Sequence, residues 1–93
     1  MSPVTTTTAL RTVTVRYFAA AKSAAGLDAE AVEVPAGATV AALAEDLAER
    51  HGAEFARVLA RCSYLVDEVA VRDPQRVLPD AAVVDVLPPF AGG

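Results

Sequence analysis

Within residues 11–18, apolar and polar residues alternate from Thr12 to Tyr17. Val13, Val15 and Tyr17 fall on one face of an extended chain, whereas Phe18 falls on the other face among polar residues. A period of two residues is typical of a strand with one buried face. The pattern therefore predicts a strand over residues 11–18 that leaves Phe18 outside the core.

Three later segments have a helical pattern. Residues 19–25 are rich in alanine and end at Gly26, a residue type that is favoured at helix C-termini. Thr39 is a favoured N-cap, and apolar residues recur after it at helical spacing. We therefore predict a short helix over 19–25, the main helix from 40 to about 51, and a third helix around 55–59.

Further short apolar runs predict the remaining strands. They are residues 31–34, 64–66, 69–71 and 83–87, with a few more strand residues expected near Val77. The two middle runs flank Asp67-Glu68 and predict a hairpin. Strands and helices in this order, without an internal repeat or a domain boundary, indicate one α+β domain with a helix on one face of a sheet.

The last strand runs directly into Pro88-Pro89-Phe90-Ala91-Gly92-Gly93. Proline lacks a backbone N–H and has a fixed φ, so the pair ends the strand and holds the tail extended. Glycine has no Cβ, so a carboxylate at Gly93 can enter a narrow slot. At about 3.3 Å per residue, the tail reaches roughly 20 Å from the domain. We expect it to end in a free carboxylate that needs no processing protease.

Two motifs carry a resemblance to a known family. VLPPFAGG at 86–93 and VTVRYFA at 13–19 resemble the end and the first strand of bacterial molybdopterin synthase small subunits, which are ubiquitin-like sulfur carriers of the MoaD/ThiS family. The resemblance covers residues 11–93. It implies a ubiquitin-like β-grasp, an α+β fold whose mixed sheet has one main helix packed on one face and whose first and last strands are parallel neighbours.

The resemblance divides the chain into three parts. We expect a flexible N-terminal tail at residues 1–10, the β-grasp domain at 11–87, and an extended reactive tail at 88–93. Threonine-rich termini of this kind are commonly loose.

Phe18 and Leu87 both fall on outward faces of their strands. If these strands are parallel neighbours, the two side chains meet beside the root of the tail, and an exposed apolar patch there is a docking site. The resemblance implies partner binding through Phe18, Leu87, Pro88, Pro89, Phe90 and Ala91. Ala70 stands where the family often has a larger apolar side chain, which narrows the patch.

The resemblance also implies the chemistry, with Gly93 as the reacting residue and Gly92 beside it. A ubiquitin-activating-like adenylyltransferase and sulfurtransferase uses ATP and Mg²⁺ to adenylate Gly93, and a persulfide then converts it to a thiocarboxylate. The tail donates this sulfur to cyclic pyranopterin monophosphate in the large subunit of molybdopterin synthase. This chain would be the non-catalytic small subunit, with no cofactor of its own.

Three alternatives share the tail. Sibling carriers serve thiamine-thiazole or cysteine synthesis, and only the Pro-Pro-Phe context and the overall likeness favour the molybdenum route over them. A ubiquitin-like modifier would be joined through Gly93 to lysines. A plain β-grasp interaction domain would have an inert tail.

Composition narrows the partners. The formal net charge of the 93 residues is −4 and the basic residues form no cluster, so we predict no nucleic-acid or membrane partner. A single cysteine cannot build a disulfide framework, which fits a reducing cytoplasm. Residues 1–10 lack the features of a signal peptide, and no segment approaches the ~18 apolar residues of a membrane span.

Other chemically capable residues are isolated. His51 is predicted to be a polar residue at a helix end, where the helix dipole favours it, and Cys62 a small buried hydrophobe. Asp28 and Glu30 are predicted to lie in a solvated turn, and Lys22 on the surface. The sequence contains no Gly-rich phosphate loop, metal-ligand cluster or Ser/His/Asp set.

Overall fold

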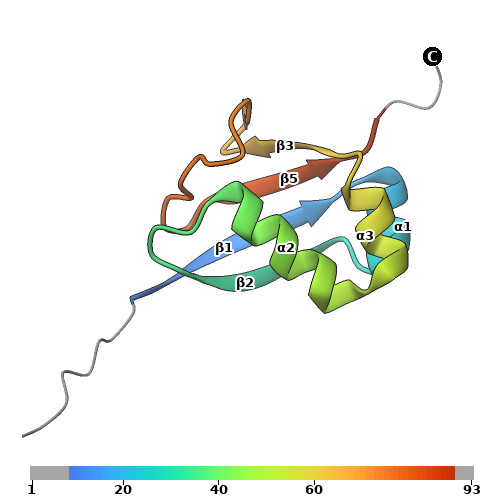
Figure 1. Ribbon diagram of the computed structural model, residues 1–93, viewed down its shortest axis with the longest axis horizontal. Helices are drawn as coiled ribbons and strands as arrows, with labels where there is room; N and C mark the ends of the chain where they lie inside the picture. Colours follow the sequence, from blue (N-terminus) through green and yellow to red (C-terminus); the bar gives the residue numbers. More distant parts are fainter. Residues whose placement is uncertain (1–8, 90–93) are drawn as a thin grey trace, which may run out of the picture.

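A computed structural model describes residues 9–89 of the chain. These residues form strands and helices in the α+β order expected from the sequence (Figure 1). The elements are β1 (Leu10–Tyr17), α1 (Ala19–Ala25), β2 (Ala29–Pro35), α2 (Val40–His51), α3 (Ala53–Leu59), β3 (Ser63–Val66), β4 (Val69–Ala70) and β5 (Val83–Leu87).

The strands form one mixed sheet in the order β2-β1-β5-β3-β4. The pairing of β1 with β5 is parallel, and it sets Thr14 opposite Val83 and Tyr17 opposite Val86. The other three pairings are antiparallel. The predicted central pair of parallel end strands is therefore confirmed, and both strands point toward the end of the sheet where α1 lies (Figure 1).

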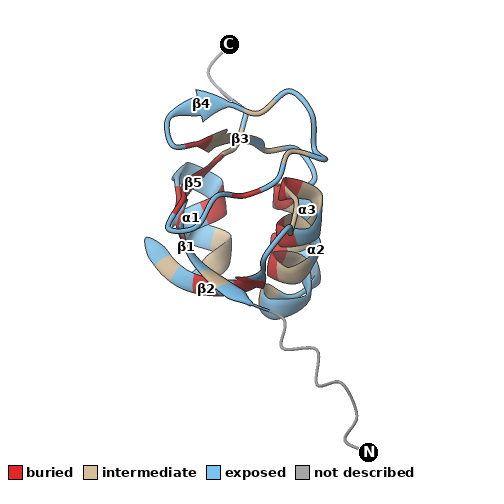
Figure 2. Ribbon diagram, turned by 90° about the vertical axis from the view of Figure 1, so that its left-hand side faces the viewer, coloured by how far each residue is buried: buried red, intermediate tan, exposed pale blue. Residues whose placement is uncertain are grey.

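Helices α2 and α3 cover one face of the sheet (Figure 2). The core lies between this face and the helices, and its largest fully buried side chains are Phe55, Leu43, Leu47, Leu78, Val13, Val15, Val32, Val40, Val66, Val84 and Val86. The alternation in β1 is as predicted, because Val13, Val15 and Tyr17 are buried while Thr14 and Arg16 are exposed.

The helix boundaries follow the predicted signals. The Oγ1 atom of Thr39 accepts a hydrogen bond of 3.1 Å from the backbone N–H of Ala42, as an N-cap should. Gly26 ends α1 with a left-handed φ of 79°, and its N–H donates to the carbonyl of Lys22. Among residues 9–89, none of the helices combines the length and the apolar character needed to cross a membrane.

Several boundaries differ from those predicted. Strand β1 begins at Leu10, one residue inside the segment assigned to the N-terminal tail. Strand β2 begins at Ala29, two residues earlier than predicted, and therefore includes Glu30. Near Val77 there is only an isolated bridge, to Thr39. Most of the two predicted tails, residues 1–8 and 90–93, lies outside the described residues.

The β3–β4 hairpin turns through two residues with positive φ, Asp67 at 48° and Glu68 at 69°. Two-residue hairpin turns of this hand require positive φ at both positions, which is why Asn-Gly is common there. Asp67 also fastens the turn to β5: its N–H donates to the Val83 carbonyl over 2.8 Å, and its Oδ1 accepts from the Val83 N–H over 2.9 Å.

Replacing Glu68 with glycine should stabilise the protein. The left-handed conformation costs a non-glycine residue about 1–2 kcal/mol, whereas glycine loses roughly 0.5–1 kcal/mol more backbone entropy on folding. We expect Glu68→Gly to raise the free energy of unfolding by about 0.5–1 kcal/mol in urea titrations. The control Glu45→Gly, on the exposed side of α2, should lower it by a similar amount. Equal losses in both variants would contradict the strain argument.

Candidate functional site

The end of the β1–β5 pair brings Phe18 and Leu87 together. Phe18 comes directly after Tyr17, which lies opposite Val86. The N–H of Phe18 donates to the Val86 carbonyl over 3.3 Å. Its side chain is 39% exposed, and Leu87 is half-buried. Because neighbouring residues of a strand point to opposite faces, Leu87 faces away from the buried Val86. The apolar pair thus lies beside the root of the tail, as the sequence predicted; its docking role stays a prediction.

The tail leaves the sheet at this same place. Strand β5 ends at Leu87, and Pro88 and Pro89 follow it, the first half-buried and the second exposed. Phe90, Ala91, Gly92 and Gly93, to which binding and reactivity were assigned, lie outside the described residues. Ala70, where the family often has a larger apolar side chain, is exposed and lies opposite Leu65 in the β3–β4 hairpin.

A two-pronged ion pair lies next to this apolar pair on the face opposite α2 and α3. Arg16 donates from Nε to Asp85 Oδ1 over 2.5 Å and from Nη2 to Asp85 Oδ2 over 2.8 Å. The side chain of Asp85 is only 8% exposed, whereas that of Arg16 is 46% exposed. The guanidinium carbon of Arg16 lies 5.9 Å from the centre of the Phe18 ring. The ion pair therefore connects Asp85, on the central strand β5, to the apolar pair through Arg16.

Sequence reasoning missed the role of Asp85. The available signal was an acidic residue inside the apolar run of the last strand. That signal becomes specific only with the parallel register, which sets Asp85 opposite Arg16.

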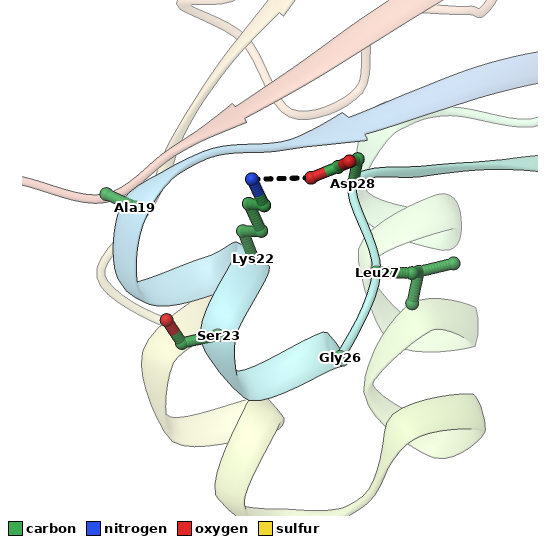
Figure 3. Close-up of a pocket in the computed structure, with 6 residues that line it drawn as sticks. All are labelled: Ala19, Lys22, Ser23, Gly26, Leu27 and Asp28. Atoms are coloured by element: carbon green, nitrogen blue, oxygen red, sulfur yellow. Dashed lines mark ion pairs between the residues drawn. The ribbon is translucent and has the colours of Figure 1, made fainter.

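A shallow hollow of about 690 Å³ opens beside α1 (Figure 3). It is lined by Ala19, Lys22, Ser23, Gly26, Leu27 and Asp28. The Nζ atom of Lys22 lies 2.6 Å from Asp28 Oδ1, and both side chains are largely exposed, so this pair adds little stability. Lys22 is therefore on the surface and Asp28 is solvated, as predicted.

Comparison with protein families assigns residues 15–93 to the ThiS family. The chain belongs to the ThiS family. A structure from Pyrococcus furiosus described as a proposed molybdopterin converting factor subunit 1 is 33% identical, with a TM-score of 0.77, over 86% of this chain and 99% of that one. A search of curated protein sequences found no match.

Two further solved structures are similar to this ThiS family member. The complex of subunits 1 and 2 of molybdopterin-converting factor from Helicobacter pylori contains a chain 26% identical, with a TM-score of 0.62, over 88% of this chain and 99% of that one. Small archaeal modifier protein 1 from Haloferax volcanii is 22% identical, with a TM-score of 0.77, over 88% of this chain and 99% of that one. It has the same fold as this chain. The chain thus has the ubiquitin-like β-grasp of sulfur carriers and ubiquitin-like modifiers.

A polar cluster on the helix-covered face corrects the prediction made for Glu30. Glu30 Oε2 accepts a hydrogen bond of 2.5 Å from the Tyr17 hydroxyl and lies 2.5 Å from His51 Nε2. Arg50 Nη1 is 3.6 Å from the other carboxylate oxygen. The prediction of a solvated turn for Glu30 is therefore wrong. His51 ends α2, as predicted, and its contact with Glu30 was not foreseen. The cause is the longer β2, which turns Glu30 toward the end of α2.

Aromatic packing completes this cluster. The rings of Tyr17 and Phe55 meet edge to face with centres 5.5 Å apart, and the rings of His51 and Phe55 are 4.9 Å apart. Burial raises the pKa of the Tyr17 phenol, and the hydrogen bond to Glu30 raises it further. Burial opposes ionisation of Glu30, but the hydrogen bonds from Tyr17 and His51, together with electrostatic attraction to His51 and Arg50, outweigh it and lower the pKa of Glu30. The cluster holds the β1 end that carries Phe18.

Cys62 lies in a different place, a groove of about 310 Å³ beside α2 and α3. Its Sγ donates to the Val58 carbonyl over 3.2 Å, and burial raises the pKa of the thiol. A half-buried, protonated thiol fits the predicted structural role. Burial also raises the pKa of the neighbouring Tyr64 to about 12. Over residues 9–89, no group of three or more His, Cys, Asp or Glu side chains could hold a metal ion.

Glu30→Gln should flatten the dependence of stability on pH. The pKa of Glu30 is lower in the folded protein than its ordinary value of 4.5, so its ionised form stabilises the fold above that value. This contribution is lost as the pH falls below 4.5 and through the folded-state pKa. We expect Glu30→Gln to lower the free energy of unfolding by about 1–3 kcal/mol near pH 7 and by less below pH 4.5. Urea titrations at neutral and at acidic pH measure the two values.

Glu33→Gln is the matched control, because Glu33 is an exposed residue of the same strand. It should change the free energy of unfolding by less than about 0.5 kcal/mol. If the Glu30 variant lost the same stability in acid as at neutral pH, the proposed linkage would be wrong.

Proposed function

We propose that this ThiS family member is a sulfur carrier for molybdopterin synthesis. One observation carries the proposal most directly: the exposed Phe18 and the half-buried Leu87 lie where β5 passes into the Pro88-Pro89 tail. A partner that docks on these side chains lies directly beside the outgoing tail. The 33% identity to the Pyrococcus furiosus protein described as a proposed molybdopterin converting factor subunit 1 supports the molybdenum branch of the family.

The proposed chemistry takes place at the Gly93 carboxylate. A carboxylate resists nucleophiles, so a partner adenylyltransferase uses ATP and Mg²⁺ to form an acyl-adenylate, with pyrophosphate as the leaving group. The sulfur of a partner's persulfide then attacks the acyl carbon and displaces AMP. A second thiol cleaves the resulting S–S bond and releases the Gly93 thiocarboxylate. Thiocarboxylates are acidic and soft, so at neutral pH the group is an anionic sulfur donor.

The proposed acceptor of this sulfur is cyclic pyranopterin monophosphate, bound by the large subunit of molybdopterin synthase. A complex between subunits 1 and 2 is known for the related Helicobacter pylori factor, which supports a partner of this kind. This chain contributes the tail and the docking surface, and the partners contribute the catalytic groups. Its single thiol, Cys62, is hydrogen-bonded beside the helices and has a raised pKa, so it is a poor nucleophile.

A second candidate function is that of a ubiquitin-like modifier. Similarity in fold to small archaeal modifier protein 1 favours it over an inert domain. In that case the activated Gly93 carboxylate would form an amide with a lysine of another protein. Thiamine-thiazole and cysteine synthesis are the other sulfur-transfer pathways compatible with the same tail. Intact-mass analysis of the product separates conjugation from thiocarboxylate formation.

Deleting Gly93 should abolish sulfur loading without affecting the fold. The deletion leaves the carboxylate one residue, roughly 3.5 Å, short of the reacting centre, and a misplacement of this size costs at least about 100-fold in rate. The measurement is intact-mass spectrometry after incubation with the adenylyltransferase, ATP and a sulfur source. Wild type should gain the mass of one oxygen-to-sulfur exchange. A deletion variant that gains it at the wild-type rate would refute the proposal.

Phe18→Arg or Leu87→Arg should weaken binding of the molybdopterin synthase large subunit by well over 1 kcal/mol, as expected for central interface anchors. Isothermal titration calorimetry measures the effect, and circular dichroism checks that the variants are folded. Val77→Arg is the control, because Val77 has an exposed apolar side chain and its backbone forms an isolated β-bridge with Thr39, just before α2. Equal affinities for all three variants would exclude the proposed docking surface.

A further inference from the structure

Arg16 occupies a central position on the open face of the sheet, between two hollows. One hollow, of about 460 Å³, is lined by Arg16 together with Phe18, Lys22 and other residues around the start of α1. The other, of about 360 Å³, is lined by Arg16 together with Asp67, Glu68 and Val83. Arg16 therefore separates the apolar end of the face from the acidic hairpin turn, and a surface that fits both hollows must straddle it.

The guanidinium is held in one orientation before any partner arrives. Asp85 fixes it from β5 through Nε and Nη2, and the Phe18 ring lies below it at 5.9 Å. A guanidinium has five N–H donors, and these two bonds leave both donors of Nη1 and one donor of Nη2 without a partner among residues 9–89. The Arg16 side chain is 46% exposed, so water can reach it in the free protein.

Docking over the apolar patch changes that situation. A partner that covers Phe18 also covers the guanidinium that lies over its ring, and Leu87 follows Asp85 on the same face of β5. Water is then removed from the free donors of Arg16. A buried donor without an acceptor is costly, and the cost is greater for a charged group. An entirely apolar partner surface would therefore bind poorly here.

We propose that Arg16, positioned by Asp85, determines partner specificity: the docking partner presents an oxygen acceptor to Nη1, and surfaces without one are rejected. This inference rests on the proposed function, since it concerns the surface that covers Phe18 and Leu87. The ion pair thus adds a polar requirement to an otherwise apolar site, and selection against wrong partners through an unsatisfied polar group is a known route to specificity.

The ion pair can be removed without leaving an unpaired charge. Replacing both partners of such a pair with apolar residues is often neutral for folding, so Arg16→Met combined with Asp85→Val separates binding from stability. If the pair served only the fold, this more apolar surface would bind the partner equally well or more tightly. If the partner brings an acceptor, that acceptor faces a methionine and loses its hydrogen bond.

The test is calorimetric titration of the molybdopterin synthase large subunit with each variant. We expect the double variant to raise Kd by about 10- to 100-fold. The control removes a surface ion pair on α3, in which Arg57 Nη1 lies 3.8 Å from Glu54 Oε2. The variant Glu54→Val with Arg57→Met should leave Kd unchanged. Unchanged or tighter binding by the Arg16/Asp85 variant would overturn the inference while leaving the proposed function intact.

Two further outcomes are decisive. Arg16→Lys keeps the positive charge beside Asp85 but not the two-pronged geometry, so it should also raise Kd, and it serves as the test if the double variant does not fold. Wild-type affinity in a folded Arg16→Lys protein would contradict the positioning role. If the wild-type chain did not bind the large subunit at all, the proposed function would fail and this inference with it.

Discussion

The parallel pairing of β1 with β5 decides where the tail leaves the domain. The two strands point the same way, so the end of β1, which carries Phe18, and the end of β5, which carries Leu87, meet at one edge of the sheet. Strand β5 also pairs with β3 on its other edge, and its Val84 and Val86 are buried in the core. A change in this register by one residue would turn Leu87 into the core and Val86 out of it.

The two faces of the sheet have different roles because only one is covered by helices. On the covered face, apolar packing and the cluster of Tyr17, Glu30 and His51 hold the end of β1 in place. On the open face, the pair of Arg16 and Asp85 is stable beside water because the arginine keeps much of its exposure. The open face is therefore free to bind, while its backbone is fixed from the other side.

Local signals predicted most of the fold. The alternation in β1, the cap at Thr39 and the glycine at position 26 each act over a few residues, so the sequence contains them in full. The strand order came from the resemblance, since no local pattern encodes which strands pair. Glu30 and His51 are 21 residues apart, and Arg16 and Asp85 are 69 apart. Contacts of this kind depend on register, which is why sequence reasoning missed them.

The most direct test of this account is chemical-shift mapping of the isotopically labelled protein with the molybdopterin synthase large subunit. The account predicts that the largest changes cluster at Arg16, Phe18 and Leu87, where β1 and β5 end, and that α2 and α3 change little. The groove lined by Cys62 and Tyr64 provides the comparison. Changes concentrated in that groove, with the ends of β1 and β5 unaffected, would contradict the account.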